Sequence, residues 1–408
     1  MMTQANLAVR QARFASEAGQ RDANSPDWLL IGAVIALTVI GLVFVFSASV
    51  AVGQQLFGDP RYFAIRQLAG AVVGLLAFVA LARLDYRRLR TWSPIILLIA
   101  IVGLVAVLMP GIGVEQNGAR RWMQIGSLPP VQPSEFAKLA VAIYVAAWLA
   151  SRGPAIRHVT LGVVPFAVMV GFFGFLIMAE PDLGTALVIV IIAGAMFFIA
   201  GAALRHILAL TAVGGGVLFG IIAIAGYGLE RFTSFVAAES DPQASGFQTL
   251  QLLIALGSGG PTGVGIGESR QKFLYVPSAH TDGVFAIIGE EAGFVGALLV
   301  IGLVGFLVYR GARIAARTSD PFGMLLATGI VAWIVVQAFF NIGGVTRTIP
   351  LTGIPLPFIS FGSSALIATL AAAGVLVSIS RFARQDEGPA WLQRRQANQK
   401  RTSLERSR

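Results

Sequence analysis

Long apolar segments separated by short polar ones dominate the hydrophobic pattern of the chain. A segment of about 20 apolar residues is long enough to cross the hydrocarbon core of a bilayer as a helix. Backbone polar groups must be satisfied internally in lipid, and unalternating apolar runs favour helices over the strands of a barrel. The pattern therefore predicts an all-α, polytopic bundle with about ten transmembrane helices, at residues 28–50, 64–82, 93–110, 134–150, 160–179, 184–201, 206–227, 284–309, 321–343 and 360–380.

One further apolar stretch, residues 250–256, is too short to span. It lies in a long polar loop, residues 228–283, between the seventh and eighth predicted spans. We expect it to lie in the membrane interface or to form a re-entrant segment. Loops of this length in a compact domain are usually functional or disordered, and the mixed composition of this one favours function.

Composition and charge agree with a membrane bundle and add its orientation. Hydrophobic residues make up 56% of the 408-residue chain and charged residues 12%. With ten spans, both termini lie on one side, and placing them in the cytoplasm puts about twice as many Lys and Arg residues inside as outside. The net charge of +10 is therefore mainly a topology signal, and nucleic acid is not an expected partner.

Three regions follow from this pattern. Residues 1–27 form a polar cytoplasmic segment before an uncleaved first helix, and residues 28–383 form the transmembrane domain. Residues 384–408 are basic and poor in apolar side chains, which predicts a disordered cytoplasmic tail that anionic lipid headgroups could attract. The chain has no cysteine, which excludes disulfides and thiolate metal sites.

The first outer loop, residues 111–133, and the helix after it carry candidate anion-binding residues. Arg120 and Arg121 lie in the loop, and Ser134 followed by Glu135 indicates a helix start. Glu135 and Lys138 are three residues apart and share a helix face. Two interpretations stay open: a structural ion pair, or a site where Lys138 with Arg120 or Arg121 meets a phosphate-bearing ligand.

Carboxylates also occur at two helix ends. Glu180 and Asp182 precede the sixth span, where Asp182 could cap the helix or the two could serve a metal or a substrate. Glu290 and Glu291 lie two turns into the eighth span, where inter-helix pairing and a functional role are both reasonable.

The densest group of polar residues lies at the end of the long loop. Lys272, His280 and Asp282 fall within eleven positions, directly before the eighth span. Partial desolvation at a helix mouth would raise the pKa of Asp282 towards that of a general base, although Asp282 could simply cap the helix. The glycines at 257–267 could wrap a pyrophosphate near Lys272. Further candidates in the same loop are Arg231 and Gln248.

The last outer loop contains three prolines between residues 350 and 357 and small polar residues after them. Prolines prevent regular helix there, so this backbone must line a cavity or be buried in protein. We expect it to form one wall of an outer pocket that includes Ser360 and Ser363.

At these motifs the chain resembles the SEDS family, the FtsW, RodA and SpoVE proteins of bacterial cell-wall synthesis. The resemblance runs from about Gly41 to Ala383 and is most like the division-type FtsW branch, because of NGARRW. Ser278, where the family usually has Glu, and Glu180, where it usually has Gln, are departures. The motifs are GLVFVFSAS, NGARRWMQIG, QPSEFAK, EPDLGTA, QKFLYVPSAHTDGVFAIIGEEAGFVG and PLTGIPLPFISFGSSA.

The resemblance implies a peptidoglycan glycosyltransferase that polymerises lipid II at the outer face of the bacterial cytoplasmic membrane, at the division septum. It implies a class B penicillin-binding protein, an FtsI-like transpeptidase, as partner, together with other division proteins. It also makes Asp282 the essential aspartate, which would act as a lone general base. The leaving pyrophosphate needs cations, for which Lys272, Arg231, Arg120, Arg121 and Lys138 are candidates, and a divalent cation such as Mg or Mn could share that task.

Three alternatives remain. An elongation-type, RodA-like polymerase would have the same chemistry. A lipid II flippase or other transporter suits many helices and intramembrane carboxylates, although the polar groups gather on one side and no inverted repeat is evident. A non-catalytic scaffold leaves the convergence of Asp282, His280 and the cations unexplained.

Overall fold

Ten long helices lie at the ten predicted positions. The computed structural model describes residues 25–116, 119–124, 126, 129–225, 235 and 246–383. Within them, eight helices have the length and hydropathy to cross a membrane, with α6 counted from Val159, while α7 and the segment Leu204–Gly220 of α8 are shorter. The ten are α2 Trp28–Phe57, α3 Tyr62–Arg83, α4 Arg87–Leu108, α5 Pro133–Arg152, α6 Val164–Ala179, α7 Leu183–Ile199, α8 Leu204–Ala225, α11 Val284–Arg317, α12 Pro321–Val345 and α13 Ser363–Phe382.

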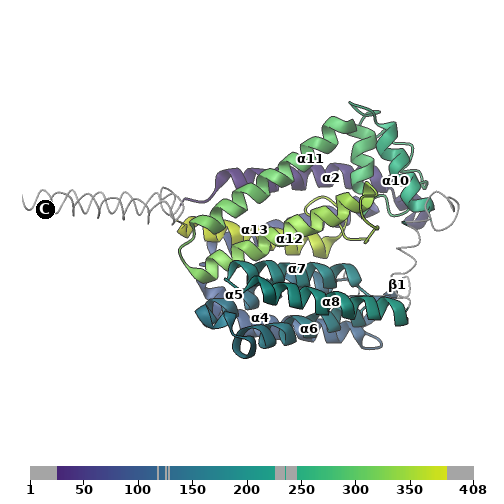
Figure 1. Cartoon of the computed structure of the whole chain (residues 1–408). Coiled ribbons are helices and arrows are strands. Elements are labelled where there is room, and N and C mark those ends of the chain that lie inside the picture. The colour runs from purple at the N-terminus through teal and green to yellow at the C-terminus, as the bar shows by residue number, and fades with distance from the viewer. Residues whose placement is uncertain are drawn as a thin grey trace, which may run out of the picture.

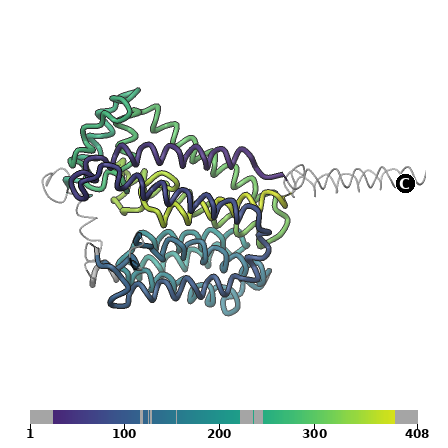
Figure 2. The backbone as a smooth tube through the Cα atoms, turned by 180° about the vertical axis from the view of Figure 1, so that it is seen from behind, coloured from purple at the N-terminus to yellow at the C-terminus, as the bar shows by residue number. Residues whose placement is uncertain are grey.

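The bundle is built around α13, which packs against α3, α5 and α12 and is the most buried of the eight (Figure 1). Small residues allow this close packing, since a side chain at Gly374 would overlap the backbone of Phe78 on α3. Helices α4 to α8 lie together on one side of α12 and α13, and α2, α10 and α11 lie on the other (Figures 1 and 2).

The first and last helices meet at the same end of the bundle. The backbone N–H of Asp27 donates to Ser380 Oγ at 3.1 Å, and Arg310 on α11 pairs with Asp27 at 2.6 Å. The opposite end, called the outer end below, carries α10 Phe247–Ser258, the hairpin after α4 and the 346–362 loop (Figure 1). The prediction that both ends of the transmembrane domain share one side is confirmed. The assignment of that side to the cytoplasm still rests on the arginine distribution.

Two features of the outer end were not predicted. The first is a hairpin: strands β1 Gly113–Gln116 and β2 Ala119–Met123 pair antiparallel in the first outer loop, with Gly113 opposite Met123.

The apolar stretch in the long loop is the twelve-residue helix α10, which is too short to span, as predicted.

The second unpredicted feature is a break in α11 at Gly293, where φ is 68° and ψ is −167°. The glycine-rich loop fills this break: Val264 N–H donates to the Glu290 carbonyl at 3.0 Å, and Phe294 N–H donates to the Gly260 carbonyl at 2.9 Å. Only glycine fits at position 259, because a Cβ there would overlap the carbonyl of Gly289. These bonds replace those that the broken helix lacks.

Smaller helical turns complete the described chain: η1 Gly153–Arg157, followed by the π-helix η2 Val159–Val163, which leads into α6.

Candidate functional site

Two amides of α12, one helical turn apart, hold the 346–362 loop. Gln337 Nε2 donates to the Pro355 carbonyl at 2.9 Å, and Asn341 Nδ2 donates to the Ile354 carbonyl at 2.9 Å. Each amide also contacts one predicted site residue. Asn341 Nδ2 lies 2.9 Å from the carbonyl of Asp282, and Gln337 Oε1 lies 3.1 Å from Lys138 Nζ. One helix face therefore gathers Asp282, Lys138 and the last outer loop.

Asp282 lies in the turn before α11 and is 9% exposed. Thr281 Oγ1 donates to its Oδ1 at 3.0 Å. The turn is tight: Ser278 adopts φ of 56°, and its carbonyl accepts the N–H groups of Thr281 and Gly283. The N-cap residue of α11 is Gly283, with no side-chain cap, so the capping interpretation of Asp282 is wrong. Asp282 is instead a buried carboxylate whose backbone is fixed by Asn341.

His280 lies two residues before Asp282, inside an aromatic cluster. Its ring centroid is 4.4 Å from that of Phe63 and 5.4 Å from that of Phe361. Burial lowers the pKa of His280 to about 4, so the imidazole is neutral near pH 7. A neutral ring cannot contribute positive charge to a phosphate site, and the geometry supports a packing role between α3 and the last outer loop.

The Glu135–Lys138 pair is buried at the start of α5, with 2.8 Å between Nζ and Oε2. The start of this helix at Pro133, with Glu135 in its first turn, agrees with the expected helix start. The Lys138 ammonium also lies 5.0 Å from the Trp333 ring centroid. Because Lys138 is 1% exposed and already has these partners, the contacts support the structural interpretation of this pair.

Ser360 and Ser363 hold the end of the 346–362 loop. Ser360 Oγ accepts the Leu356 N–H at 2.8 Å, and Ser363 Oγ donates to the Arg66 carbonyl at 3.2 Å. Gln67 on α3 clamps the same segment, donating to the Ser360 carbonyl at 3.1 Å and accepting the Gly362 N–H at 3.1 Å. The two serines thus shape the wall that the prolines predicted.

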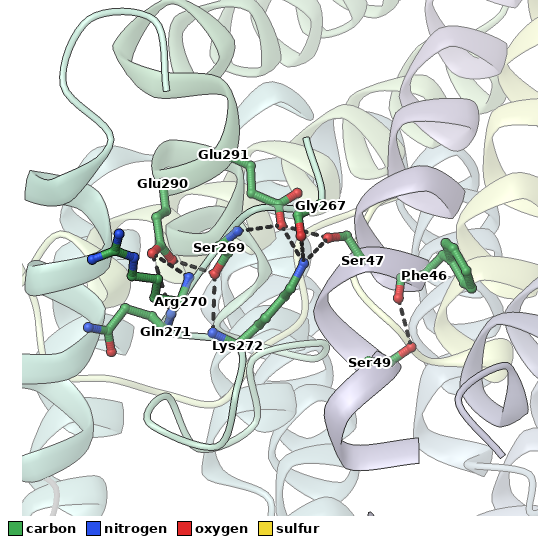
Figure 3. Close-up of polar contacts among 10 residues, drawn as sticks. All are labelled: Phe46, Ser47, Ser49, Gly267, Ser269, Arg270, Gln271, Lys272, Glu290 and Glu291. Atoms are coloured by element: carbon green, nitrogen blue, oxygen red, sulfur yellow. Dashed lines mark hydrogen bonds and ion pairs between the residues drawn. The ribbon is translucent and has the colours of Figure 1, made fainter. Parts of the chain in front are cut away.

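Lys272 is also buried, at 4% exposure, between the long loop, α2 and α11 (Figure 3). Its Nζ lies 3.1 Å from Glu291 Oε1 and 3.0 Å from Ser47 Oγ, and it donates to the Gly267 carbonyl. Ser47 in turn donates to Glu291 at 2.6 Å. This arrangement makes Lys272 a tether for the glycine-rich loop, so a direct contact with a pyrophosphate stays a prediction.

The carboxylate of Glu290 binds backbone N–H groups of the same loop (Figure 3). It accepts the N–H of Arg270 at 2.9 Å and that of Gln271 at 3.4 Å, and it also accepts the Ser269 hydroxyl. Glu291 makes an inter-helix contact through Ser47 of α2, which was one of the two interpretations, whereas Glu290 bonds to the long loop and not to another helix.

The two arginines of the hairpin have different surroundings. Arg120 pairs with the exposed Glu115 at 3.3 Å, and the two side chains are 42% and 59% exposed. Arg121 donates to the carbonyls of Glu180 and Pro181, and so joins the hairpin to the α6–α7 turn. Of the two, Arg120 has the more accessible guanidinium for a ligand.

Asp182 caps α7, as one interpretation held: its Oδ1 accepts the Thr185 N–H at 3.1 Å. Glu180 is fully buried, and neither carboxyl oxygen makes a hydrogen bond with the residues that the structure describes. Burial raises the pKa of Glu180 to about 9, Asp182 adds to the rise and Arg121 opposes it. Glu180 is therefore protonated near pH 7.

The remaining predicted residues lie further from these contacts. Gln248 at the start of α10 donates to the Pro277 carbonyl at 3.5 Å and so touches the turn that leads to Asp282. Arg231 lies outside the described residues, as does part of the NGARRW motif.

A metal held by protein ligands alone does not fit the described residues. They contain no group of three or more His, Cys, Asp or Glu side chains that could hold an ion. Mg²⁺ sites commonly use one or two carboxylates together with substrate phosphates, and Asp282 could supply one such ligand. The divalent cation stays a prediction.

Sequence reasoning gave no role to two residues that organise the site. Ser47 appeared only within the GLVFVFSAS motif, yet it completes the Lys272–Glu291 network. Gln67 was not singled out, yet it binds both sides of the Ser360–Gly362 segment. Each is a polar residue inside an apolar span, a signal that marks functional or packing contacts in membranes.

Most of the chain, including these motifs, matches one known protein family. The model of the FtsW/RodA/SpoVE family, described as cell cycle protein, matches residues 27–385. The chain belongs to this family. Among its relatives, stage V sporulation protein E of Bacillus subtilis is 43% identical over 361 residues, covering 88% of this chain and 98% of that protein. A protein of Trichlorobacter lovleyi named probable peptidoglycan glycosyltransferase FtsW is 38% identical and covers 87% of this chain and 93% of its own.

Solved structures of the family share the fold. A chain in a peptidoglycan synthase complex, described by its structural coordination of polymerization and crosslinking, superposes with a TM-score of 0.72 at 28% identity. It is matched over 99% of its length and 89% of this one. The rod shape determining protein RodA of Thermus thermophilus superposes with a TM-score of 0.64 at 29% identity, with the same two coverages. The present chain is thus a multi-pass membrane protein of this family.

Proposed function

We propose that this protein is a peptidoglycan glycosyltransferase that polymerises lipid II at the outer face of the cytoplasmic membrane. Family membership and the relatives named as glycosyltransferases support the activity. The mechanism rests on the position of Asp282, which is a buried carboxylate at the outer end. Asn341 holds it there by binding both the Asp282 carbonyl and the Ile354 carbonyl of the last outer loop.

In the proposed reaction, Asp282 takes the proton of an acceptor sugar hydroxyl. The hydroxyl oxygen forms a bond to the anomeric carbon of the donor as the bond from that carbon to the pyrophosphate breaks. The electron pair leaves with the lipid pyrophosphate. A hydroxyl is a poor nucleophile until its proton is removed, so a carboxylate held in a fixed position lowers the barrier to attack.

Among the described residues, the other buried carboxylates have different roles, and Glu180 is protonated near pH 7 and cannot accept a proton, so Asp282 is the proposed base. Asp182 caps a helix, Glu135 and Glu291 pair with lysines, and Glu290 binds loop backbone. Ser278, four residues before Asp282, stands where the family usually has Glu, so a second catalytic carboxylate is not expected in this turn. A lone base suits inversion by direct displacement of a pyrophosphate, which needs no covalent sugar intermediate.

Charge on the leaving group would be met by Arg120, the accessible arginine of the hairpin, and a divalent cation is a second candidate. Because its guanidinium is exposed and its partner Glu115 is too, Arg120 could exchange that pair for a phosphate at small cost.

A class B penicillin-binding protein is the proposed partner, and the division septum the proposed location. The similar chain of known structure is part of a complex that coordinates polymerization and crosslinking. The NGARRW motif favours the division branch. Co-purification with a tagged FtsI-like transpeptidase, and septal fluorescence of a tagged copy, are the expected results. Uniform sidewall fluorescence would favour the elongation branch.

The activity is tested by incubating the purified protein, alone and with its transpeptidase, with fluorescent lipid II. We expect glycan strands and released polyprenyl pyrophosphate. The same protein in vesicles should not accelerate lipid II movement between leaflets. Movement without any glycan strands would contradict polymerisation and support a flippase.

A further inference from the structure

A cavity of about 360 Å³ lies at the opposite end of the bundle from Asp282. It opens between the start of α2 and the last two turns of α11. Its lining includes Asp27, Trp28, Arg310, Arg313 and Arg317. None of these residues takes part in the proposed reaction.

The lining carries an excess of positive charge. Arg310, Arg313 and Arg317 follow one another at three- and four-residue steps, which places them on one face of α11. Asp27 is the one carboxylate among the described lining residues. The described lining residues therefore carry two more positive than negative charges on a concave surface, where focusing of the field favours an anion.

Asp27 balances the charge of only one arginine, because its single negative charge is paired with Arg310. Its Oδ2 accepts from Arg310 at 2.6 Å and 3.1 Å, and its Oδ1 accepts the Leu30 N–H at 3.0 Å. Arg313 is exposed and has no hydrogen-bond or ion-pair partner among the residues that the structure describes. Arg317 already has a partner, and a guanidinium with five N–H donors can bind a second group beside the first.

The surroundings of the cavity are those of a membrane interface. Trp28 and Leu29, which line it, are 70% and 57% exposed, and Tyr309 beside Arg310 is 57% exposed. Trp and Tyr concentrate at the level of the lipid headgroups. A lipid whose headgroup enters the cavity would therefore keep its acyl chains beside the apolar faces of α2 and α11.

We propose that this cavity binds the phosphate of an anionic phospholipid from the leaflet at this end of the bundle. Arg313 and Arg317 would donate to the phosphate oxygens in the forked geometry that guanidinium groups favour, and Arg310 would stay paired with Asp27. The bound lipid would join the ends of α2 and α11, the same two helices that Ser47, Lys272 and Glu291 join at the outer end.

The test uses full-length protein purified in detergent, with phosphatidylglycerol and phosphatidylcholine added in separate titrations. The variants are Arg313→Gln and the double variant Arg313→Gln/Arg317→Gln. The matched control is Arg88→Gln/Arg90→Gln, which removes two exposed arginines from α4, outside the cavity lining. The thermal unfolding midpoint and the phosphatidylglycerol retained in native mass spectrometry are measured for each.

Phosphatidylglycerol should raise the midpoint of the wild type and of the α4 control. The double variant should lose this rise and retain about tenfold less phosphatidylglycerol, because charge-assisted hydrogen bonds are among the strong ones, and Arg313→Gln alone should show an intermediate loss.

An equal loss in the α4 control would overturn the proposal, because it would show attraction to surface charge in general. Inorganic phosphate that gives the same rise in midpoint at equal concentration would also overturn it, in favour of a soluble anion.

Discussion

Two buried lysine–glutamate pairs lie at the outer end of the bundle, and they are built in opposite ways. Lys138 and Glu135 are one turn apart on α5, at 2.8 Å. Lys272 and Glu291 join a loop to α11 at 3.1 Å, and Ser47 of α2 completes the group. Both lysines were candidate phosphate ligands from the sequence, and both are nearly inaccessible. A buried lysine near an active site can therefore stabilise the structure around the site without binding the substrate.

The difference between the pairs lies in what each connects. The pair on α5 is local, and its further contacts, Gln337 and Trp333, both belong to α12. The Lys272 pair joins the loop that fills the break at Gly293 to α11, and through Ser47 it joins both to α2, which is 225 positions away in the chain. Loss of the second pair should consequently release more structure.

The largest effect on stability is expected for Lys272→Met. Breaking this buried pair leaves the Glu291 charge without a cation, with only neutral donors such as Ser47, and costs about 3–5 kcal/mol. The thermal unfolding midpoint of the purified protein should fall, and protease cleavage in the glycine-rich loop should increase. Adding Glu291→Gln to Lys272→Met removes the stranded charge and should restore much of the midpoint. A single variant with an unchanged midpoint that only raises KM for lipid II would instead show that Lys272 binds substrate.

Lys138→Ala should destabilise by about 3 kcal/mol, the lower end of the range for a broken buried pair, because the partner lies within the same helix. If the pair is structural, Glu135→Ala lowers the midpoint by a similar amount and glycan synthesis falls in parallel. An alternative result, in which Lys138→Ala keeps the midpoint and loses lipid II binding while Glu135→Ala does not, would establish anion binding.

Glu180 differs from the glutamates of both pairs, because it is a buried carboxyl with no lysine paired to it among the described residues. Its pKa is raised to about 9, so the folded state holds a proton that the unfolded state releases above about pH 4.5. Stability should therefore decrease as pH rises between these values. Glu180→Gln, which introduces the residue usual in the family, should flatten this dependence and raise the midpoint at pH 8. A slope that persists unchanged in the variant would show that another group causes it.

The smallest change in stability is expected for Arg120→Ala. Its pair with Glu115 is solvent-exposed, and such pairs contribute about 0–1 kcal/mol. If Arg120 meets the leaving pyrophosphate, the rate of polymerisation should fall while the unfolding midpoint stays constant. Glu115→Ala is the matched control, and it should leave both quantities near the wild-type values.

The helices and their order could be predicted from the sequence because they depend on local hydrophobicity. All ten spans lie where the apolar pattern placed them, and residues 250–256 fall in a helix too short to cross. The Asp182 cap and the Glu135–Lys138 spacing were likewise readable, since each involves residues three apart.

The long-range contacts could not be predicted in this way. Ser47 and Lys272 are 225 positions apart, and nothing in either local sequence indicates the other. The break at Gly293 depends on backbone groups of the glycine-rich loop, which the sequence showed as a possible pyrophosphate nest. The position of Asp282 was predicted, but its fixation by Asn341 required the packing of α12.

The most direct test of the account is polymerisation of lipid II by the Asp282→Asn variant, purified with its transpeptidase partner. Asparagine keeps the size of the side chain and removes its basicity, so the unfolding midpoint and partner binding should match the wild type. We predict that no glycan strands form from lipid II. Glycan strands formed at the wild-type rate would remove Asp282 from the mechanism and contradict the account.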